Sequence, residues 1–199
     1  DLFSTEEIRE ARAREQIQQI PLSELYPFKD HPFRVVDDDR MMETVESIKE
    51  YGVLVPAIAR PLEEGGYEII AGHRRKRACE LARLDTMPVI VRDLDDDEAV
   101  IIMVDSNLQR ENILPSERAK AYQMKLEAIR RKAGRPSREN CSQLGNNFEG
   151  KRSLEILAED APDSKNQIHR FIRLNSLDQP LKDKVDSGEL AFTPAVELS

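Results

Sequence analysis

The sequence has no Trp, only two Cys, and no apolar run near the roughly 18–20 residues that cross a bilayer. Cys79 and Cys141 have no CxxC spacing, which argues against a zinc site or a disulfide framework. Two free thiols are typical of a reducing compartment. Of the 199 residues, 39% are hydrophobic and 34% charged, as in helix-rich globular proteins. We therefore expect a cytoplasmic protein without a membrane segment.

The chain has fewer basic than acidic residues. It contains 30 Lys and Arg and 38 Asp and Glu, which gives a net charge of −8. This balance lowers the expectation of nucleic-acid binding. The charges separate along the chain, however: residues 93–98 are mostly acidic, whereas residues 130–152 carry a basic excess. Because affinity for DNA depends on the local field at the phosphates, the total charge does not exclude DNA as a partner.

The kind of secondary structure that the sequence predicts changes near the middle of the chain. In the first half the patterns predict strands and helices in alternation: strands at 19–22, 53–60, 67–71 and 87–92, and helices at 38–51 and 74–83. Asp37 or Asp38 would cap the helix that runs to about Tyr51, in which Met42, Val45 and Ile48 recur at three-residue spacing. Gly52 is its stop. Helices at 95–106, 115–132 and beyond a Gly-, Ser- and Asn-rich loop at 134–150 follow. We expect an α+β domain at 18–112, an all-α domain at 113–199 and a helical arm at 1–17.

A run of basic residues follows Gly72 at the start of an expected helix, after the apolar strand at 67–71. A helix N-terminus carries about half a positive charge, so cations there are unfavourable unless an anion is present. A phosphate is such an anion, and Arg74 and Arg75 would bind its oxygens. The alternative is a solvated basic helix face.

Polar residues also interrupt the helical pattern at its end, in the segment 105–118. Asn107 offers an amide oxygen suited to Mg²⁺, and Arg110 offers a second phosphate donor. Taken alone, this segment is better explained as a helix end with a capping Asn and a new helix near Ser116.

Residues 153–174 have the spacing of a helix-turn-helix. Ala158 is small where the two helices would cross, Ile168 would fill the core between them, and Asp163 or Ser164 would cap the second helix. The second helix exposes no acid. Its candidate DNA contacts suit base edges and phosphates: Ser164, Lys165, Asn166, Gln167, His169, Arg170 and Arg173. An ordinary helical hairpin with a polar face is the alternative.

Three segments in this order, GVLVPAIAR (52–60), AGHRRKRA (71–78) and SNLQRENILPSERAKAY (106–122), resemble the ParB partition-protein family, whose usual forms are close to GxxQPxxVR, GERRxRA and ENxQRxxLxPxEEAxAY. The resemblance implies a ParB/sulfiredoxin-like nucleotide-binding domain followed by a helix-turn-helix domain. It also implies CTP with Mg²⁺ as ligand, a homodimer on a palindromic centromere-like site in double-stranded DNA, a ParA-type ATPase partner, and a nucleoid- or plasmid-associated location. Because the sequence lacks an initiating Met and ends in a predicted helix, we expect a fragment or a short family member.

Carried over by position, the resemblance assigns the base and ribose to residues 52–56, phosphates to the start of the 74–83 helix and to Arg110, and the metal to Asn107. The implied nucleotide contacts are Gly52, Val53, Leu54, Pro56, Gly72, His73, Arg74, Arg75, Ser106, Asn107 and Arg110. His73 and Ser106 replace two family Glu residues that are associated with metal binding and CTP hydrolysis. A neutral His is a poor Mg²⁺ ligand, so we expect binding without efficient hydrolysis. When protonated, His73 would instead contact a phosphate.

Two other functions stay open. The first is a helix-turn-helix transcriptional regulator with a vestigial nucleotide pocket, which the changes at His73 and Ser106 favour. The second is a nucleotide-dependent enzyme of the same fold. A sulfiredoxin-like reductase needs a Cys where Gly72 stands, and a kinase needs a catalytic carboxylate that the matched positions lack.

Overall fold

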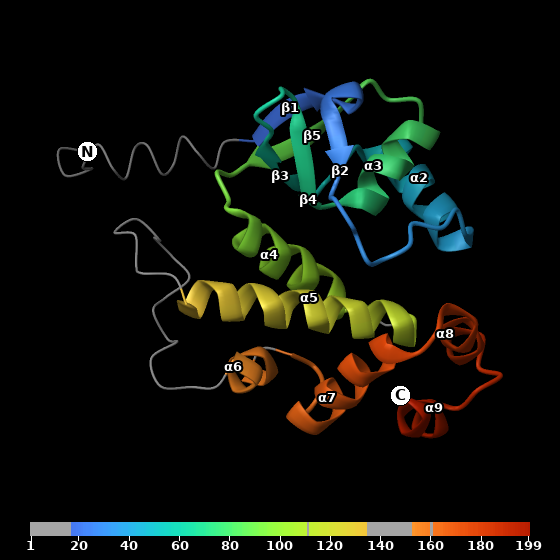
Figure 1. Cartoon of the computed structure of the whole chain (residues 1–199). Helices are drawn as coiled ribbons and strands as arrows, with labels where there is room; N and C mark the ends of the chain where they lie inside the picture. The colour runs from blue at the N-terminus through green and yellow to red at the C-terminus, as the bar shows by residue number, and fades with distance from the viewer. Residues whose placement is uncertain (1–16, 111, 135–152, 160) are drawn as a thin grey trace. The chain divides into compact units, whose positions relative to one another are not determined.

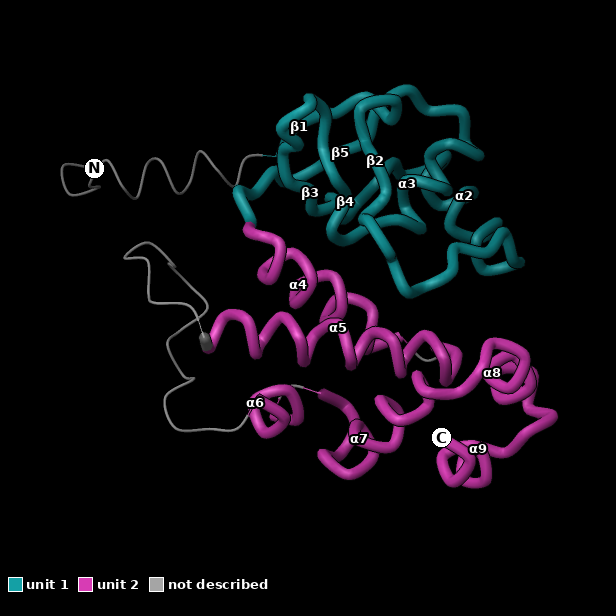
Figure 2. Tube along the Cα trace, in the orientation of Figure 1, with its two compact units in different colours: residues 1–94 teal, residues 95–199 magenta. Residues whose placement is uncertain are grey.

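The computed structural model describes residues 17–110, 112–134, 153–159 and 161–199. The chain divides into two compact units, residues 1–94 and 95–199 (Figures 1 and 2). The predicted arm at 1–17 and the predicted loop at 134–150 lie outside the described residues, apart from Ile17 and Gly134. No helix in the described part of the chain is long and apolar enough to span a membrane.

The division between the units falls earlier than the sequence predicts. The expected boundary is at residue 112, whereas the units part between Leu94 and Asp95. The physical reason is that α4 (Asp96–Leu108) packs along α5 (Pro115–Gly134) and so belongs to the helical unit. Three ion pairs join these two helices: Asp97–Arg131, Glu98–Lys132 and Asp105–Lys125.

A mixed five-stranded sheet in the order β1-β5-β3-β4-β2 forms the centre of the first unit. The β1/β5 and β3/β4 pairs are antiparallel, and the β3/β5 and β2/β4 pairs are parallel. The elements are β1 (Ile17–Pro21), η1 (Leu22–Glu24), β2 (Leu25–Pro27), α2 (Asp39–Tyr51), β3 (Ala57–Pro61), β4 (Tyr67–Ala71), α3 (His73–Leu81) and β5 (Thr86–Val91). The α+β prediction is confirmed, but residues 53–56 form a loop rather than the start of a strand.

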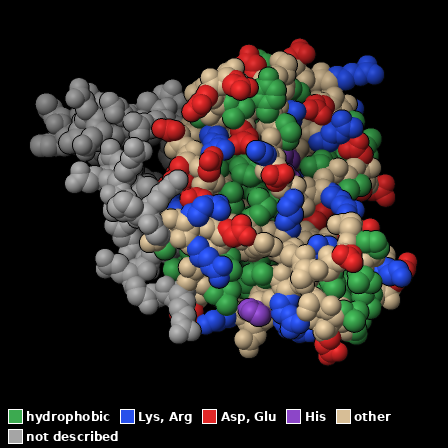
Figure 3. Space-filling model, in the orientation of Figure 1, with side chains coloured by type: hydrophobic (Ala, Val, Ile, Leu, Met, Phe, Trp, Pro, Cys, Tyr) green, Lys and Arg blue, Asp and Glu red, His purple; other side chains and the backbone are tan. Residues whose placement is uncertain are grey.

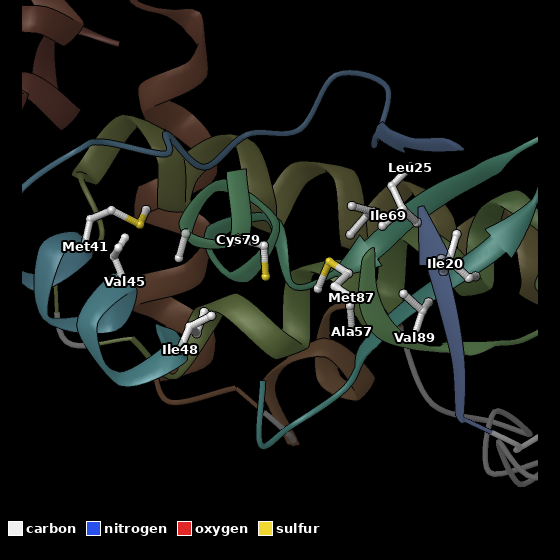
Figure 4. Close-up of a cluster of buried hydrophobic side chains, with 12 residues drawn as sticks. Ile20, Leu25, Met41, Val45, Ile48, Ala57, Ile69, Cys79, Met87 and Val89 are labelled. Carbon is white, nitrogen blue, oxygen red and sulfur yellow. The ribbon is translucent and has the colours of Figure 1, made fainter. Parts of the chain in front are cut away.

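Helix α2 begins and ends where the sequence predicts. The Asp38 carboxylate accepts the backbone N–H of Met41 at 2.8 Å, and Gly52 ends the helix with φ 72°. The predicted core stripe is wrong by one residue, because Met42 is 52% exposed and Met41 is fully buried. With Val45 and Ile48, Met41 forms an i, i+4, i+7 stripe that joins the core cluster of the unit (Figure 4).

This shift predicts a stability difference between two neighbouring methionines. Met41→Ala should lower the free energy of unfolding by about 2–5 kcal/mol, because it leaves a cavity in the core. Met42→Ala should change it by less than about 0.5 kcal/mol, because that side chain is exposed. Urea denaturation of the two variants measures the difference; equal losses would place Met42 in the core after all.

The second unit is built around α5, which contacts α4 and most of the helices that follow it. These are α6 (Ser153–Glu159), α7 (Lys165–Arg173), η2 (Leu174–Ser176), α8 (Gln179–Asp186) and α9 (Phe192–Leu198). The N-terminal half of α5 makes side-chain bonds to later elements: Ser116 binds Asp186 in α8, and the Ala119 carbonyl accepts from Asn175 in η2. The elements that the structure describes in the second half are all helices, as predicted.

Candidate functional site

A hollow of about 340 Å³ in the first unit gathers part of the predicted nucleotide site. The loop residues Gly52, Val53, Leu54 and Val55 line it together with Arg75 of α3. The sequence did not point to the other wall, which is the polar face of α2 with Glu43, Thr44 and Ser47 beside Ile48. The sequence feature that could have pointed to this wall is the spacing of its polar residues. They lie three and four positions apart, which places them on one face of a helix.

Arg75 connects the loop to the start of α3. Its Nη1 donates to the carbonyl oxygens of Val55 and Pro56, both at 2.6 Å. Burial lowers the pKa of this guanidinium below its usual range. Arg75 therefore holds the loop at residues 52–56, which is expected to face the base. The sequence had predicted only a phosphate contact for this side chain.

Gly72 is required by both backbone geometry and packing. It precedes α3 with φ 119°, a conformation that L side chains rarely adopt. A Cβ at this position would lie 2.8 Å from the Cβ of Ala57 in β3. The close approach of α3 to the sheet thus depends on the missing side chain.

The basic residues that begin α3 have carboxylate partners within the unit. Arg74 pairs with Asp38 at 3.2 Å, Arg77 pairs with Asp37 at 2.6 Å, and Lys76 pairs with Glu80 at 3.0 Å. Arg77 lowers the pKa of Asp37, and the pKa of Asp38 is lowered mainly by the Met41 N–H. The chain itself therefore supplies anions for Arg74, Lys76 and Arg77, and these cations do not require a phosphate.

His73 points into the protein rather than toward a ligand. It is 8% exposed, its Nε2 accepts the backbone N–H of Phe28 at 3.2 Å, and its ring centroid lies 3.8 Å from that of His31. An imidazolium has no acceptor nitrogen, so the expected phosphate contact of a protonated His73 does not fit this arrangement. The side chain holds the segment before α2 in place.

The predicted metal and second phosphate residues lie at the end of α4 in the second unit. Asn107 is 2% exposed, and its Nδ2 donates to the Met103 carbonyl at 2.7 Å. The Ser106 hydroxyl donates to the same carbonyl at 2.9 Å. Arg110 follows the helix and donates its backbone N–H to the Asn107 carbonyl at 3.0 Å.

Helices α6 and α7 contact each other, and both pack against α5, which is the arrangement expected of the predicted helix-turn-helix. Leu157 and Ile168 are fully buried, and Phe171 is 7% exposed. Ser164 caps α7 by accepting the Gln167 N–H at 3.3 Å, so of the two predicted caps it is the one used. These apolar residues of the two helices are buried as expected, and the helix-turn-helix itself stays a prediction.

The predicted DNA-contacting side chains of α7 differ in how they are held. Lys165 pairs with Glu155, whereas Arg173 donates to the carbonyl of Ser199. Arg170 and Gln167 are half-buried. Arg170 donates to Gln167 and to Thr193, and it stacks 5.0 Å from the Phe192 ring centroid. Asn166 and His169 of α7 are exposed and have no such contact with the described residues.

Charge on one face of the described residues is mixed rather than segregated. On the face shown in Figure 3, basic and acidic side chains of the described residues alternate. Local charge at α7 is therefore more informative than the net charge about binding to an anionic partner.

Comparison with known sequences identifies the family of this fold. A family model described as the ParB N-terminal domain matches residues 6–108, about half of the chain. The chain belongs to the ParB N-terminal domain family. The resemblance drawn from the three motifs is thereby confirmed.

Two curated ParB-related proteins and one crystal structure extend the match. The chain is 38% identical over 113 residues to the nucleoid occlusion protein of Listeria monocytogenes serotype 4b (strain CLIP80459), covering 57% of this chain and 40% of that protein. It is 32% identical over 190 residues to the probable chromosome 1-partitioning protein ParB of Deinococcus radiodurans, covering 96% of this chain and 58% of that protein. The chain thus spans from two fifths to three fifths of these relatives. A C-terminally truncated ParB from Caulobacter crescentus, complexed to the centromeric parS site, matches with a TM-score of 0.59 and 26% identity, covering 91% of this chain and 83% of that one.

The ParB resemblance implies Mg²⁺, and the residues near Asn107 fit it in one respect. Asn107 Oδ1 is buried, and no described residue donates to it, so it is an oxygen open to a hard cation. The family acid is missing, however, and the neighbouring carboxylate of Asp105 is paired with Lys125. Among the described residues, no group of three or more His, Cys, Asp or Glu is arranged for a metal. Asn107 Oδ1 is thus the one buried side-chain oxygen of the described residues that has no hydrogen-bond partner.

Proposed function

We propose that this chain carries the nucleotide-binding and DNA-binding parts of a ParB-like partition protein, which binds double-stranded DNA and closes as a clamp when CTP binds. The observation that carries the DNA-binding part is the outer face of α7. Asn166, His169 and Arg173 lie on it at helical spacing, while Ile168 and Phe171 are buried beneath. The parS complex of the Caulobacter relative supports a DNA target of the same class.

Asn166 and His169 are the side chains from which we expect base recognition, because the other polar groups of α7 are tied to neighbours. Asn offers paired donor and acceptor groups that match an adenine edge, and one such pair contributes about 1–3 kcal/mol of discrimination. A duplex selected from a random library by the unmodified protein provides the probe. Asn166→Ala should then lower affinity for that duplex by about ten-fold or more and leave affinity for a scrambled duplex unchanged.

The matched control is Lys165→Ala, which removes a neighbouring exposed charge. This variant should weaken binding to both duplexes equally and flatten the dependence on salt, as expected of a phosphate contact. If Asn166→Ala also weakened both duplexes equally, α7 would not be the base-reading element. Failure of the unmodified protein to enrich any sequence would count against sequence-specific binding as a whole.

For the nucleotide, we propose that the hollow beside Gly52–Val55 receives the base and that the start of α3 receives phosphates. The loop backbone and the polar face of α2 offer hydrogen-bonding groups to a base, and Arg75 holds the loop to α3. In the second unit, Asn107 is the residue that would hold Mg²⁺. Because His73 is turned inward and Ser106 replaces an acid, we expect nucleotide binding without efficient hydrolysis.

A plain transcriptional regulator is the second candidate, and the contacts of α3 favour it. The Arg75 Nη1 already binds two carbonyls, and Arg74 already binds Asp38. In that protein the hollow would be vestigial, and DNA binding would not respond to CTP. Calorimetric titration with CTP, with and without the selected duplex, separates the two: heat with either supports the clamp.

The partners follow from the same proposal. Two copies would read the halves of a palindromic, centromere-like site, since the two-fold symmetry of a dimer matches that of the DNA. A ParA-type ATPase would act with the nucleoid- or plasmid-bound protein. Closure on CTP requires that CTP bind the closed state more tightly than the open state.

A further inference from the structure

An acidic residue stands where the proposed reading helix begins. Asp163 is the residue before Ser164, the N-cap of α7. Its Oδ2 accepts from Arg118 Nη1 at 3.1 Å and from the Tyr122 hydroxyl at 2.5 Å. Both donors belong to α5 and are 45 and 41 residues away in the sequence. The turn between α6 and α7 is thus bound to a helix that lies elsewhere in the chain.

The three residues form a largely buried polar cluster, here called the Asp163 cluster (Asp163, Arg118 and Tyr122). Tyr122 is fully buried, and the side chains of Arg118 and Asp163 are 21% and 16% exposed. Burial, and after it the bond to Asp163, raises the pKa of Tyr122 above its usual range. The hydroxyl therefore stays protonated and keeps donating to the carboxylate.

The same α5 residues also contact the far end of α7. The Arg118 guanidinium lies 5.4 Å from the centroid of the Phe171 ring, and the Tyr122 ring lies 6.0 Å from it. Phe171 is eight positions beyond Asp163, which is more than two helical turns. Contacts at both ends of α7 fix its direction as well as its position relative to α5.

The ion pair within the Asp163 cluster also affects the charge at the start of α7. A helix N-terminus attracts phosphate, but a free carboxylate beside it would repel the DNA backbone. Arg118 balances the Asp163 charge at that place. We infer that the Asp163 cluster is a positioning device that sets how α7 meets the bases and screens its own acid from the DNA, without contacting DNA itself. This inference rests on the proposed DNA-binding function.

Tyr122→Phe tests the inference with a minimal change. It removes one hydrogen bond to the carboxylate and keeps the buried ring. We expect the ratio of affinities for the selected and the scrambled duplex to fall by about ten-fold, on the scale of one hydrogen bond to a charged group. The slope of affinity against salt should stay that of the unmodified protein, because no phosphate contact is lost.

Ser116→Ala is the matched control, because it removes one hydrogen bond from α5 to a carboxylate, that of Asp186 in α8, without touching α7. It should lower Tm and leave the affinity ratio unchanged. Asp163→Asn, which keeps the size of the side chain and removes its charge, provides a second reading if Tyr122→Phe does not fold.

Three outcomes are possible. A reduced affinity ratio in Tyr122→Phe or Asp163→Asn, with the ratio kept in Ser116→Ala, supports the positioning role. If both cluster variants merely lose Tm as the control does, the cluster is only structural and the inference is overturned, while the DNA-binding proposal stands. If the unmodified protein selects no sequence, both fall together.

Discussion

Arg75→Ala is expected to lower the affinity for CTP by about a hundred-fold. The substitution removes the group that binds the Val55 and Pro56 carbonyls and the nearest cation to the hollow. A hydrogen bond from a charged donor contributes about 1.5–3 kcal/mol, so losing these contacts is on the order of a hundred-fold in Kd. Isothermal titration with CTP measures the loss.

Arg77→Ala is the control for this result, because Arg77 belongs to the same helix but binds Asp37 and Glu80 on the exposed surface. Its affinity for CTP should stay within a factor of about two of the unmodified protein, as for a surface ion pair of little net energy. If Arg75→Ala bound CTP as tightly as Arg77→Ala, the hollow would not be the nucleotide site. If CTP does not change the DNA affinity of the unmodified protein or of either variant, the function as a plain transcriptional regulator would be favoured.

Gly72→Ala should have the largest effect on stability. Two costs add: a side chain at φ 119° is strained by about 1–3 kcal/mol, and a Cβ 2.8 Å from that of the fully buried Ala57 overpacks the core by about 1–3 kcal/mol. We expect the free energy of unfolding to fall by about 4 kcal/mol, a large part of the stability of a small unit. The midpoint of urea unfolding should shift accordingly.

Gly65→Ala separates the two costs. Gly65 has φ 93°, yet nothing lies within 4 Å of an added Cβ, so only backbone strain applies. The loss should be about 1–2 kcal/mol. Equal losses in the two variants would mean that α3 moves away from β3 without cost, and that the close approach at Gly72 is not needed.

The local features of the chain could be predicted because their partners are close in sequence. Asp38 and Ser164 cap helices through the N–H of a residue three positions on, and Asp95 does the same within a capping box. Gly52 ends α2 at the predicted residue. Such signals depend on the backbone within one turn, so they can be read from composition and spacing alone.

The sequence grouped residues that the structure places around one hollow, but it did not predict their internal contacts, and nucleotide binding in that hollow stays a prediction. Gly52–Leu54 and Arg75 do line one hollow, as the motifs suggested. The inward turn of His73 was missed, because its partner, the Phe28 N–H, is 45 residues away and a backbone group has no sequence signature. The choice of Met41 over Met42 was missed for a related reason: both fit a helical spacing, and only the packing of α2 selects one.

By itself, the sequence determined the family, the order of the elements apart from the short strand β2, and the acid-free composition of α7, since each depends on residue identity and spacing. Only the tertiary structure decided which of those residues are already bound to others. In the folded chain, Arg74 binds Asp38, Arg75 binds the loop carbonyls, and Asp163 binds α5. These partners are separated by 19 to 45 residues in the sequence. A charge at the surface of a helix is equally suited to a ligand or to a neighbour, and the folded chain determines which partner is within reach.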